Sequence, residues 1–508
     1  MQKTKSQRNH YLIIALILLF YFAITLFRLN QLPVFADEAI YIRWTQLIID
    51  DWQRYLFFPM NDGKTPLQMW LMIPFQFIFK NQLFAGRFLS VLVGAGNVVL
   101  IGLISKEMTA GDRQKKFSQY IAMILTSILP FTFFHHRMAL TDALLFLNLN
   151  CSFYFTLKYI KQPKITDLLL LILSFFLALF SKLSALLFIP SLIVLILYAN
   201  KLSWKSLLKN LIYIGAALAV AFLLFYSWRF LPVFPQLFRR GSDFLYPVET
   251  LFHQEIFNIF LGNLNFFINQ YAIYFGLGIL ILAIANFNKK NKKLLGLLVL
   301  MFLAFITPLA LLGKIIYPRY LLPSSLFIIL IASINLANLL SAKEKIYHVL
   351  AGILIFLIVL HSGKFIFPSY FNIEQIPFSQ ADRVQYLEEW SSGQGIYDVS
   401  QLMLHTSQNQ SLAVATEGFF GTLPDGILMY LHRQNVNNLL VEGIGQPIHA
   451  IPDDFLTKAK NYESLWLVVN SHRITMDTSH AQLIATYCRP NRAPCLQVWD
   501  MSYLLENN

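Results

Sequence analysis

Long apolar runs recur along the first 362 residues of the chain, and they limit its fold more than any other feature. A bilayer core offers the backbone no hydrogen-bond partners, so a run of about 20 apolar residues has to cross it as a helix. The composition agrees, because 56% of the 508 residues are hydrophobic and only 13% are charged. We predict an all-α polytopic membrane bundle with eleven spans: Tyr11–Leu29, Phe84–Ser105, Ser118–His135, Ala139–Lys158, Thr166–Ser181, Ser184–Ala199, Ser206–Leu231, Leu264–Phe287, Leu294–Leu312, Tyr317–Leu340 and Ile346–Ser362.

The orientation follows from the short loops, because basic residues collect on the cytoplasmic side of membrane proteins. With eleven spans and a cytoplasmic N-terminus, 19 of the 40 Lys and Arg residues fall on that side. Thr65–Lys80 is short for a span, and most of these basic clusters would lie outside if it crossed as well. We therefore predict an interfacial or re-entrant helix there, and an extracytoplasmic C-terminus in a multi-pass cell-membrane protein. An alternative for the first run is a secretory signal peptide that ends at Val34-Phe35-Ala36.

The composition becomes polar at Gly363, which divides the chain into a membrane domain (1–362, with its first outer loop at 30–83) and an extracytoplasmic α/β domain (363–508). The second domain has eight Lys or Arg against fourteen Asp or Glu, a net charge of −6, which leaves +19 on the membrane part. The overall charge of +13 therefore does not indicate a nucleic-acid partner. The periodicity of the second domain predicts helices at Pro377–Trp390, Tyr397–Gln408, Asp425–Arg433 and Asp453–Lys460, and strands at Leu412–Glu417, Asn438–Val441, Ser464–Asn470, Gln482–Tyr487 and Leu496–Asp500.

The chain has three cysteines, too few for a disulfide framework. Cys488 and Cys495 flank a turn-like segment between two predicted strands, so we predict a hairpin disulfide in an oxidising compartment. Cys151 lies inside a predicted span and is expected to be packing material. No spacing of Cys or His resembles a zinc site, and participation of a divalent metal is left open.

Two adjacent carboxylates, Asp37 and Glu38, lie about seven residues beyond the first span, at the start of an amphipathic segment. One interpretation is that they cap this helix, because negative charge is favourable at a helix N-terminus. The other is a general base at the boundary between water and lipid. The two roles are compatible in one segment.

Several cations lie at the predicted outer ends of spans, although the positive-inside rule disfavours cations in short outer loops. Binding of an anionic phosphate at the membrane surface would explain them, and snorkelling toward lipid headgroups is the alternative. The cations in question are Lys64, Arg137, Lys182, Lys314 and Arg319, and Asp142 follows Arg137 by about one and a half helical turns.

Four short segments together resemble the GT-C superfamily of membrane glycosyltransferases, in the branch of the protein O-mannosyltransferases and the aminoarabinose-lipid A transferases. They are Ala36–Tyr41 (ADEAIY), Asp62–Leu67 (DGKTPL), His136–Asp142 (HRMALTD) and Tyr317–Pro323 (YPRYLLP), with Ser181-Lys182 as a further match. The resemblance covers about residues 10 to 340. The chain departs from the pattern around Lys64, where Gly63 replaces a glutamate and Thr65 separates the lysine from the proline.

The resemblance implies a polyprenyl-phosphate sugar donor, transfer at the extracytoplasmic face, and inversion at the anomeric carbon. Asp37 matches the essential aspartate of the family, the base that deprotonates the acceptor hydroxyl, and Glu38 would support it. Asp142 would orient Arg137 or the acceptor. The leaving lipid phosphate would be held by Lys64, Arg137, Lys182, Arg319 and Tyr320. The acceptor, whether a lipid, a glycan or a protein, stays open, as does the sugar.

Two other classes of function compete with this prediction. A transporter or flippase for a lipid-linked saccharide would need polar residues at mid-depth in several helices, whereas the charges here gather at helix ends. A sensor would use its outer domain for ligand binding and its helices only as anchors. We expect the glycosyltransferase.

Overall fold

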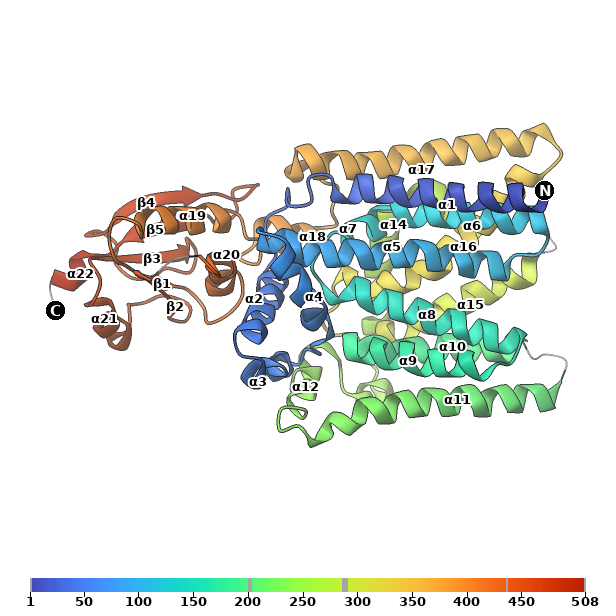
Figure 1. Cartoon of the computed structure of the whole chain (residues 1–508), viewed down its shortest axis with the longest axis horizontal. Helices are drawn as coiled ribbons and strands as arrows, with labels where there is room; N and C mark the ends of the chain where they lie inside the picture. The colour runs from blue at the N-terminus through green and yellow to red at the C-terminus, as the bar shows by residue number, and fades with distance from the viewer. Residues whose placement is uncertain (1, 200–202, 286–290, 435–436, 507–508) are drawn as a thin grey trace. The chain divides into compact units, whose positions relative to one another are not determined.

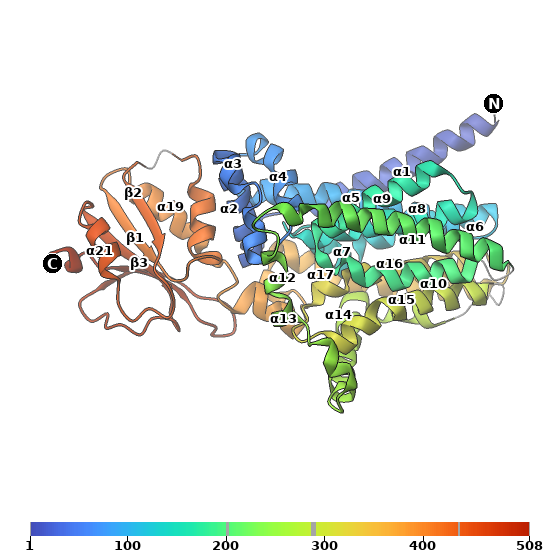
Figure 2. The ribbon, with the colours of Figure 1, turned by 90° about the horizontal axis from the view of Figure 1, so that it is seen from below.

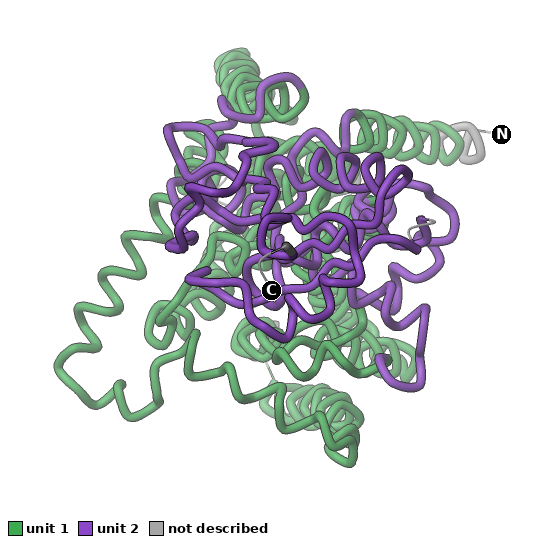
Figure 3. The backbone as a smooth tube through the Cα atoms, turned by 90° about the vertical axis from the view of Figure 1, so that its left-hand side faces the viewer, with its two compact units in different colours: residues 1–27, 56–68, 88–370 green, residues 28–55, 69–87, 371–508 purple. Residues whose placement is uncertain are grey.

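The computed structural model describes residues 2–199, 203–285, 291–434 and 437–506. It divides into two compact units, which Figure 3 shows in different colours. Unit 1 comprises residues 1–27, 56–68 and 88–370, and unit 2 comprises residues 28–55, 69–87 and 371–508. Each unit is described by itself.

Unit 1 is a bundle of long helices, and each of the eleven predicted runs forms one helix or two consecutive helices in it (Figure 1). The last two residues predicted for the Leu264–Phe287 run lie outside the described residues. The long helices are α1 (Gln2–Leu26), α5 (Gln82–Met108), α6 (Asp112–Ile128), α8 (Thr141–Lys161), α9 (Ile165–Ser181), α10 (Ile189–Ala199), α11 (Trp204–Tyr226), α14 (Ile256–Ile284), α15 (Lys292–Leu312), α16 (Ser325–Ser341) and α17 (Lys345–Phe371). Shorter elements are η1 (Phe58–Asp62), α7 (Pro130–His135), η2 (Leu183–Phe188), η3 (Ser227–Phe230), α12 (Gln236–Arg239), α13 (Gly241–Phe244), η4 (Val248–Phe252) and η6 (Pro318–Ser324).

Seven helical segments in the described part of the chain are long and apolar enough to cross a membrane. They include the α16 segment, which is almost wholly buried inside the bundle, and α1, which is mostly exposed on its flank. The helix α4 (Leu67–Ile78) has only 12 residues, with Pro74 among them. It is too short to be one of these seven segments. The fold is therefore the mostly helical membrane bundle that the apolar runs predicted.

Some helices of unit 1 pack on helices that are close to them in the sequence, and others pack on helices that are far from them in the sequence. Helix α8 lies against α9, which lies against α11, while α6 packs on α16 and α10 packs on α15. One close approach requires a glycine: Gly276 has φ +70° inside α14, and an added Cβ would lie 2.5 Å from the ring of His361. Any larger residue there would separate α14 from α17.

Unit 2 joins the segment after α1 to the C-terminal third of the chain. Its sheet has the order β2-β1-β3-β5-β4. Strands β2, β1 and β3 are parallel to one another, and β5 is antiparallel to both of its neighbours, β3 and β4. The strands are β1 (Leu412–Thr416), β2 (Leu439–Gly443), β3 (Ser464–Asn470), β4 (Gln482–Tyr487) and β5 (Leu496–Asp500). The helices are α2 (Ala36–Asp50), α3 (Trp52–Tyr55), most of α4, η7 (Ile373–Gln375), α18 (Gln380–Arg383), η8 (Val384–Glu388), α19 (Ile396–Thr406), η9 (Thr422–Gly426), α20 (Ile427–Leu431), α21 (Asp453–Ala459) and α22 (Tyr503–Glu506).

The core of the sheet is continuous, since every residue of β1 and β3 is buried. Ala413 and Ala415 share one apolar cluster with Phe455 of α21 and Leu467 of β3. All five strands lie where the sequence pattern predicted them, within one or two residues. Cys488 and Cys495, at the turn between β4 and β5, are joined by a disulfide.

Candidate functional site

The helix α2 starts at Ala36, so Asp37 and Glu38 are the second and third residues of its first turn. The side chain of Glu38 folds back, and its Oε2 accepts a hydrogen bond from the backbone N–H of Phe35 at 3.1 Å. This satisfies one of the donors that a helix start leaves without a partner. Glu38 therefore has the capping role that was one of the two sequence interpretations.

Arg87 holds the other side of Glu38, and the sequence analysis missed it. Its guanidinium donates from Nε to Glu38 Oε1 at 2.8 Å and from Nη2 to Glu38 Oε2 at 2.7 Å. Its remaining N–H groups reach the carbonyl oxygens of Leu29, Leu32 and Pro33 at 2.9 to 3.1 Å. An arginine has five N–H donors, and all five are used. Both partners of the ion pair are fully buried, so this arginine fixes the loop that leads into α2.

Asp37 differs from its neighbour in access to solvent. Its side chain is partly exposed, whereas that of Glu38 is buried. The network of Arg87 and Glu38 anchors the backbone on which Asp37 sits. A carboxylate on a rigid helix start with access to solvent has the properties that a general base needs.

The entry to α2 is also tied to the C-terminal segment of unit 2. The N–H of Ala36 donates to Ser391 O at 2.9 Å, and the N–H of Gly393 donates to Val34 O at 2.8 Å. Arg489 adds a bond from Nη2 to Ser392 O at 3.0 Å. Gly393 has no room for a side chain, because an added Cβ would lie 2.3 Å from Val34 O.

A second carboxylate of unit 2, Asp425, is buried beside α2. It accepts a hydrogen bond from the N–H of Gly421 at 2.8 Å and interacts electrostatically with Arg43. Burial raises the pKa of Asp425 to about 6, against the opposing effects of that hydrogen bond and of Arg43. Burial therefore makes the protonated form of this carboxylate more favourable than it is in water.

Unit 1 contains a separate polar cluster built from four of the predicted residues. Lys182, directly after α9, forms an ion pair with Asp142 in the first turn of α8, with 2.7 Å between Nζ and Oδ1. The same ammonium lies 4.3 Å from the ring centre of Tyr320, and the guanidinium of Arg319 lies 4.7 Å from that of Tyr317. Arg319 and Asp142 interact electrostatically, so the cluster holds two cations for one carboxylate.

Arg137 lies at the end of α1. Its Nη1 donates to the carbonyl oxygens of Ile24, Thr25 and Phe27, at distances of 2.7 to 3.2 Å, where α1 ends. Its guanidinium also lies over the ring of Tyr370 at 5.3 Å. A cation there compensates the negative end of the helix dipole. Asp142, which we expected to orient Arg137 or the acceptor, forms its ion pair with Lys182.

Two further predicted cations lie in turns of unit 1. Lys64 follows Gly63, which has φ +71°, and its side chain is partly exposed. Lys314 is exposed, and its Nζ lies 3.5 Å from Ser242 O. Among the contacts of the described residues, none joins Lys64 to the cluster of Asp142 and Lys182. The predicted phosphate set is thus brought together only in part.

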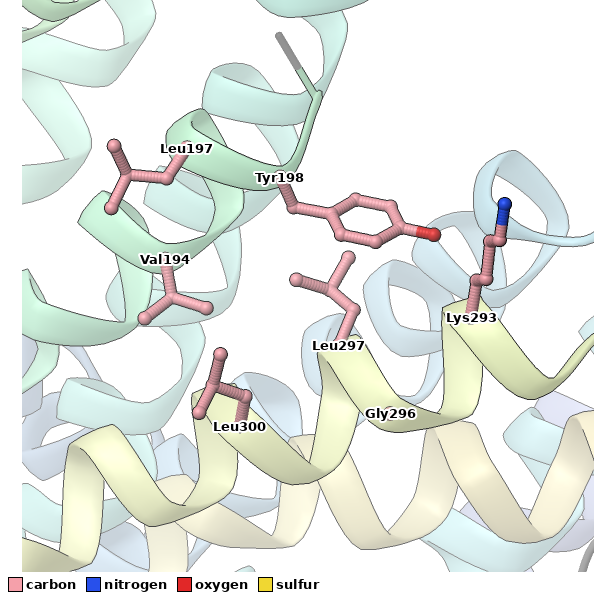
Figure 4. Close-up of a pocket in the computed structure, with 7 residues that line it drawn as sticks. All are labelled: Val194, Leu197, Tyr198, Lys293, Gly296, Leu297 and Leu300. Carbon is pink, nitrogen blue, oxygen red and sulfur yellow. The ribbon is translucent and has the colours of Figure 1, made fainter. Parts of the chain in front are cut away.

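An apolar pocket of about 380 Å³ lies between α10 and α15, at the opposite ends of these helices from Lys182 and Arg319. Figure 4 shows the ring of Tyr198 reaching from α10 toward α15, which carries Lys293 and Leu297. The pocket is therefore distinct from the cluster. In the described part of the chain, no group of three or more His, Cys, Asp or Glu residues could hold a metal ion.

Comparisons with known proteins found one matching family model and several solved structures with a similar fold. The model of the family described as dolichyl-phosphate-mannose-protein mannosyltransferase matches residues 63–228. Over 98% of the chain and 99% of the other, the structure resembles ArnT from Cupriavidus metallidurans in the apo state, with 13% identity and a TM-score of 0.56. The same protein bound to undecaprenyl phosphate gives 14% identity, coverage of 97% and 98%, and a TM-score of 0.56.

A third solved structure, the apo oligosaccharyltransferase of Archaeoglobus fulgidus, matches with 11% identity and a TM-score of 0.50 over 91% of this chain and 69% of the other. No curated protein matches by sequence. The predicted resemblance to the GT-C membrane glycosyltransferases is confirmed by the family model and by the fold. At these identities the structural likeness establishes the fold.

Proposed function

We propose that this chain is a GT-C glycosyltransferase that moves a sugar from a polyprenyl-phosphate donor to an acceptor hydroxyl on the extracytoplasmic side of the membrane. The observation that carries the proposal is Asp37, a carboxylate with access to solvent on a helix start that Glu38 and Arg87 hold rigid. The structure of ArnT bound to undecaprenyl phosphate supports the choice of lipid carrier.

In the proposed reaction, Asp37 accepts the proton of the acceptor hydroxyl while the hydroxyl oxygen attacks the anomeric carbon. The bond between that carbon and the phosphate oxygen breaks, and the configuration inverts because attack and departure occur on opposite faces. The bonding electrons leave with the polyprenyl phosphate, which gains negative charge. Fixed cations are the groups that stabilise such charge best.

Lys182 and Arg319 are the cations that we assign to the departing phosphate. They share one carboxylate, Asp142, so the cluster keeps an excess of positive charge for an anion. Tyr320 packs against Lys182 and orients it. We assign Lys64 and Arg137 a smaller part, since Arg137 already binds the end of α1.

The test is sugar transfer by the full-length protein in proteoliposomes, supplied with labelled polyprenyl-phosphate sugars and a cell-envelope acceptor extract. We expect Asp37→Asn to lower transfer by about 10² to 10⁴-fold, the usual contribution of a general base. The matched control is Asp51→Asn, an exposed carboxylate at the other end of α2, which should transfer like the wild type. Equal transfer by Asp37→Asn and the wild type would refute the proposal, and movement of labelled donor across the bilayer without acceptor would favour a flippase.

A further inference from the structure

The sheet of unit 2 has a topological switch point that the proposed catalytic chemistry does not use. The chain leaves β1 for β2 on one side and then places β3 on the other side of β1, as Figure 2 shows for the three strands. In open α/β sheets, ligands bind at the carboxyl ends of the strands that flank such a point. Here these ends carry the loops that begin at Glu417, Ile444 and Ser471.

A buried polar network lies at the carboxyl ends of β1 and β3. Glu417 accepts bonds from the N–H of Asn470 at 2.8 Å and from its Nδ2 at 2.5 Å, and Arg473 donates to the same carboxylate at 3.3 Å. Arg473 also donates to Gln446. The Oδ1 of Asn470 is buried with no hydrogen-bond partner among the described residues. Arg489 also interacts electrostatically with Glu417, so the buried carboxylate is compensated by two guanidinium groups, and the network presents planar hydrogen-bonding groups.

One aromatic side chain lies against this network, and two more lie in the loop that follows β1. The guanidinium of Arg473 lies 4.7 Å from the ring centre of Trp390, and Gly421 leaves room for the edge of that ring. Phe419 and Phe420 are 73% and 55% exposed, which is unusual for two adjacent phenylalanines in a folded domain. Phe419 lies against Gly445, whose φ of +102° suits glycine. Flat apolar faces next to planar hydrogen-bonding groups match the apolar face and the hydroxyl groups of a sugar ring.

The loop that carries these aromatics continues into η9, which packs on α2, the helix of Asp37. Thr422 at the start of η9 bonds through Oγ1 to Trp390 O at 2.7 Å, and Gly426 at its end lies beside Ala39. The aromatic surface and Asp37 therefore belong to the same compact unit. A ligand bound here is positioned relative to the base, as an acceptor must be.

We propose that this surface, built by Trp390, Phe419, Phe420, Gln446, Asn470 and Arg473, binds a neutral saccharide portion of the acceptor. That the bound saccharide belongs to the acceptor rests on the proposed function. That the surface binds a saccharide rests on the geometry of unit 2 alone. A patch that only inserted into lipid would need no buried network of acid, amide and guanidinium beneath it.

The experiment is saturation-transfer difference NMR on the full-length protein in lipid nanodiscs, titrated with mannotriose, galactotriose, maltotriose and chitotriose. We expect saturation of ring protons in at least one trisaccharide. The double variant Phe419→Ala/Phe420→Ala should bind it about tenfold more weakly, a typical loss when aromatic anchors are removed. These two side chains are exposed, so their removal leaves the fold intact. Arg473→Met serves as the second variant, although it also removes a partner of Glu417.

Two controls make the outcomes distinct. Phe77→Ala removes another exposed phenylalanine of unit 2 and should bind the trisaccharide like the wild type. Asp37→Asn should bind it normally while losing transfer, so failure of the catalytic proposal and failure of this one give different results. The saccharide site is refuted if no trisaccharide binds, or if both phenylalanines can be removed without effect. Quenching of a Phe420→Trp variant by brominated nanodisc lipids would instead identify a membrane anchor and overturn the proposal.

Discussion

One ion pair in each unit joins a basic side chain to a buried carboxylate, but the two pairs differ in burial and in the number of their charged partners. In unit 2, Arg87 uses all five N–H groups on Glu38 and three carbonyls, and both side chains are buried. In unit 1, Lys182 has a quarter of its side chain exposed, and Arg319 adds a second cation beside Asp142. All N–H donors of Arg87 are used within the protein, so the first pair offers none to a ligand. The second pair has two cations beside one carboxylate, so it can attract an anion.

The difference separates positioning from binding. A closed pair holds the backbone in place, and its loss should appear as loss of stability. An open pair with excess positive charge should contribute less to stability and more to the binding of an anion. The predictions that follow test this contrast, from the largest expected effect to the smallest.

Removing Arg87 should cost the most stability. Arg87→Ala leaves the carboxylate of Glu38 buried without its partner, which typically costs about 3 to 5 kcal/mol. Thermal unfolding of the purified protein, followed by tryptophan fluorescence, measures the loss. In the double variant Arg87→Met/Glu38→Leu, part of the stability should return, because no unpaired charge remains. A single variant as stable as the wild type would show that the pair is not structural.

Removing Lys182 should affect transfer more than folding. Lys182→Met takes one of two cations from the phosphate cluster, and we expect kcat/KM for the donor to fall about 100-fold, or roughly 2.7 kcal/mol. Arg319 still compensates Asp142, so the melting temperature should fall less than in Arg87→Ala. The matched control is Lys314→Met, an exposed lysine, which should keep wild-type values. If Lys182→Met lost stability as Arg87→Ala does, the contrast between the two pairs would disappear.

The sequence predicted the helices, the strands and their boundaries well, because apolar periodicity is a local signal. It also placed Asp37, Lys182 and Arg319 at helix ends, where charge in an apolar chain stands out. It missed Arg87, a single cation in the second turn of α5, because its importance comes from carbonyls more than 50 residues away. The hydrogen bonds of Arg137 were not predicted for the related reason that its closeness to Asp142 in the sequence says nothing about the carbonyl groups at the end of α1. The switch point of unit 2 depends on strand order, which periodicity does not contain.

Asp425 offers a third case, a buried carboxylate without a direct ion pair. Its pKa of about 6 lies above the ordinary value of 3.8, so the folded state keeps its proton over a pH range in which the unfolded state has lost it. The free energy of unfolding should therefore fall as the pH rises from about 4 to 6 and level off above that range. Asp425→Asn should remove this slope and raise stability at pH 7.5 by an amount of order 2 kcal/mol. Melting curves at several pH values test it, and an unchanged slope in the variant would contradict it.

The smallest effect is expected for an ion pair at the surface. Arg240 bonds to Asp62 at 2.7 Å, but its side chain is 41% exposed, and it also pairs with Asp243 at 3.4 Å. Water and salt screen such a pair, so Arg240→Ala should cost only about 0.2 to 1 kcal/mol, and less at 0.5 M salt than at 0.05 M. Thermal unfolding at the two salt concentrations measures both values. A loss as large as that of Arg87→Ala would mean that exposure does not set the strength of ion pairs in this protein, and the distinction between closed and open pairs would lose its physical basis.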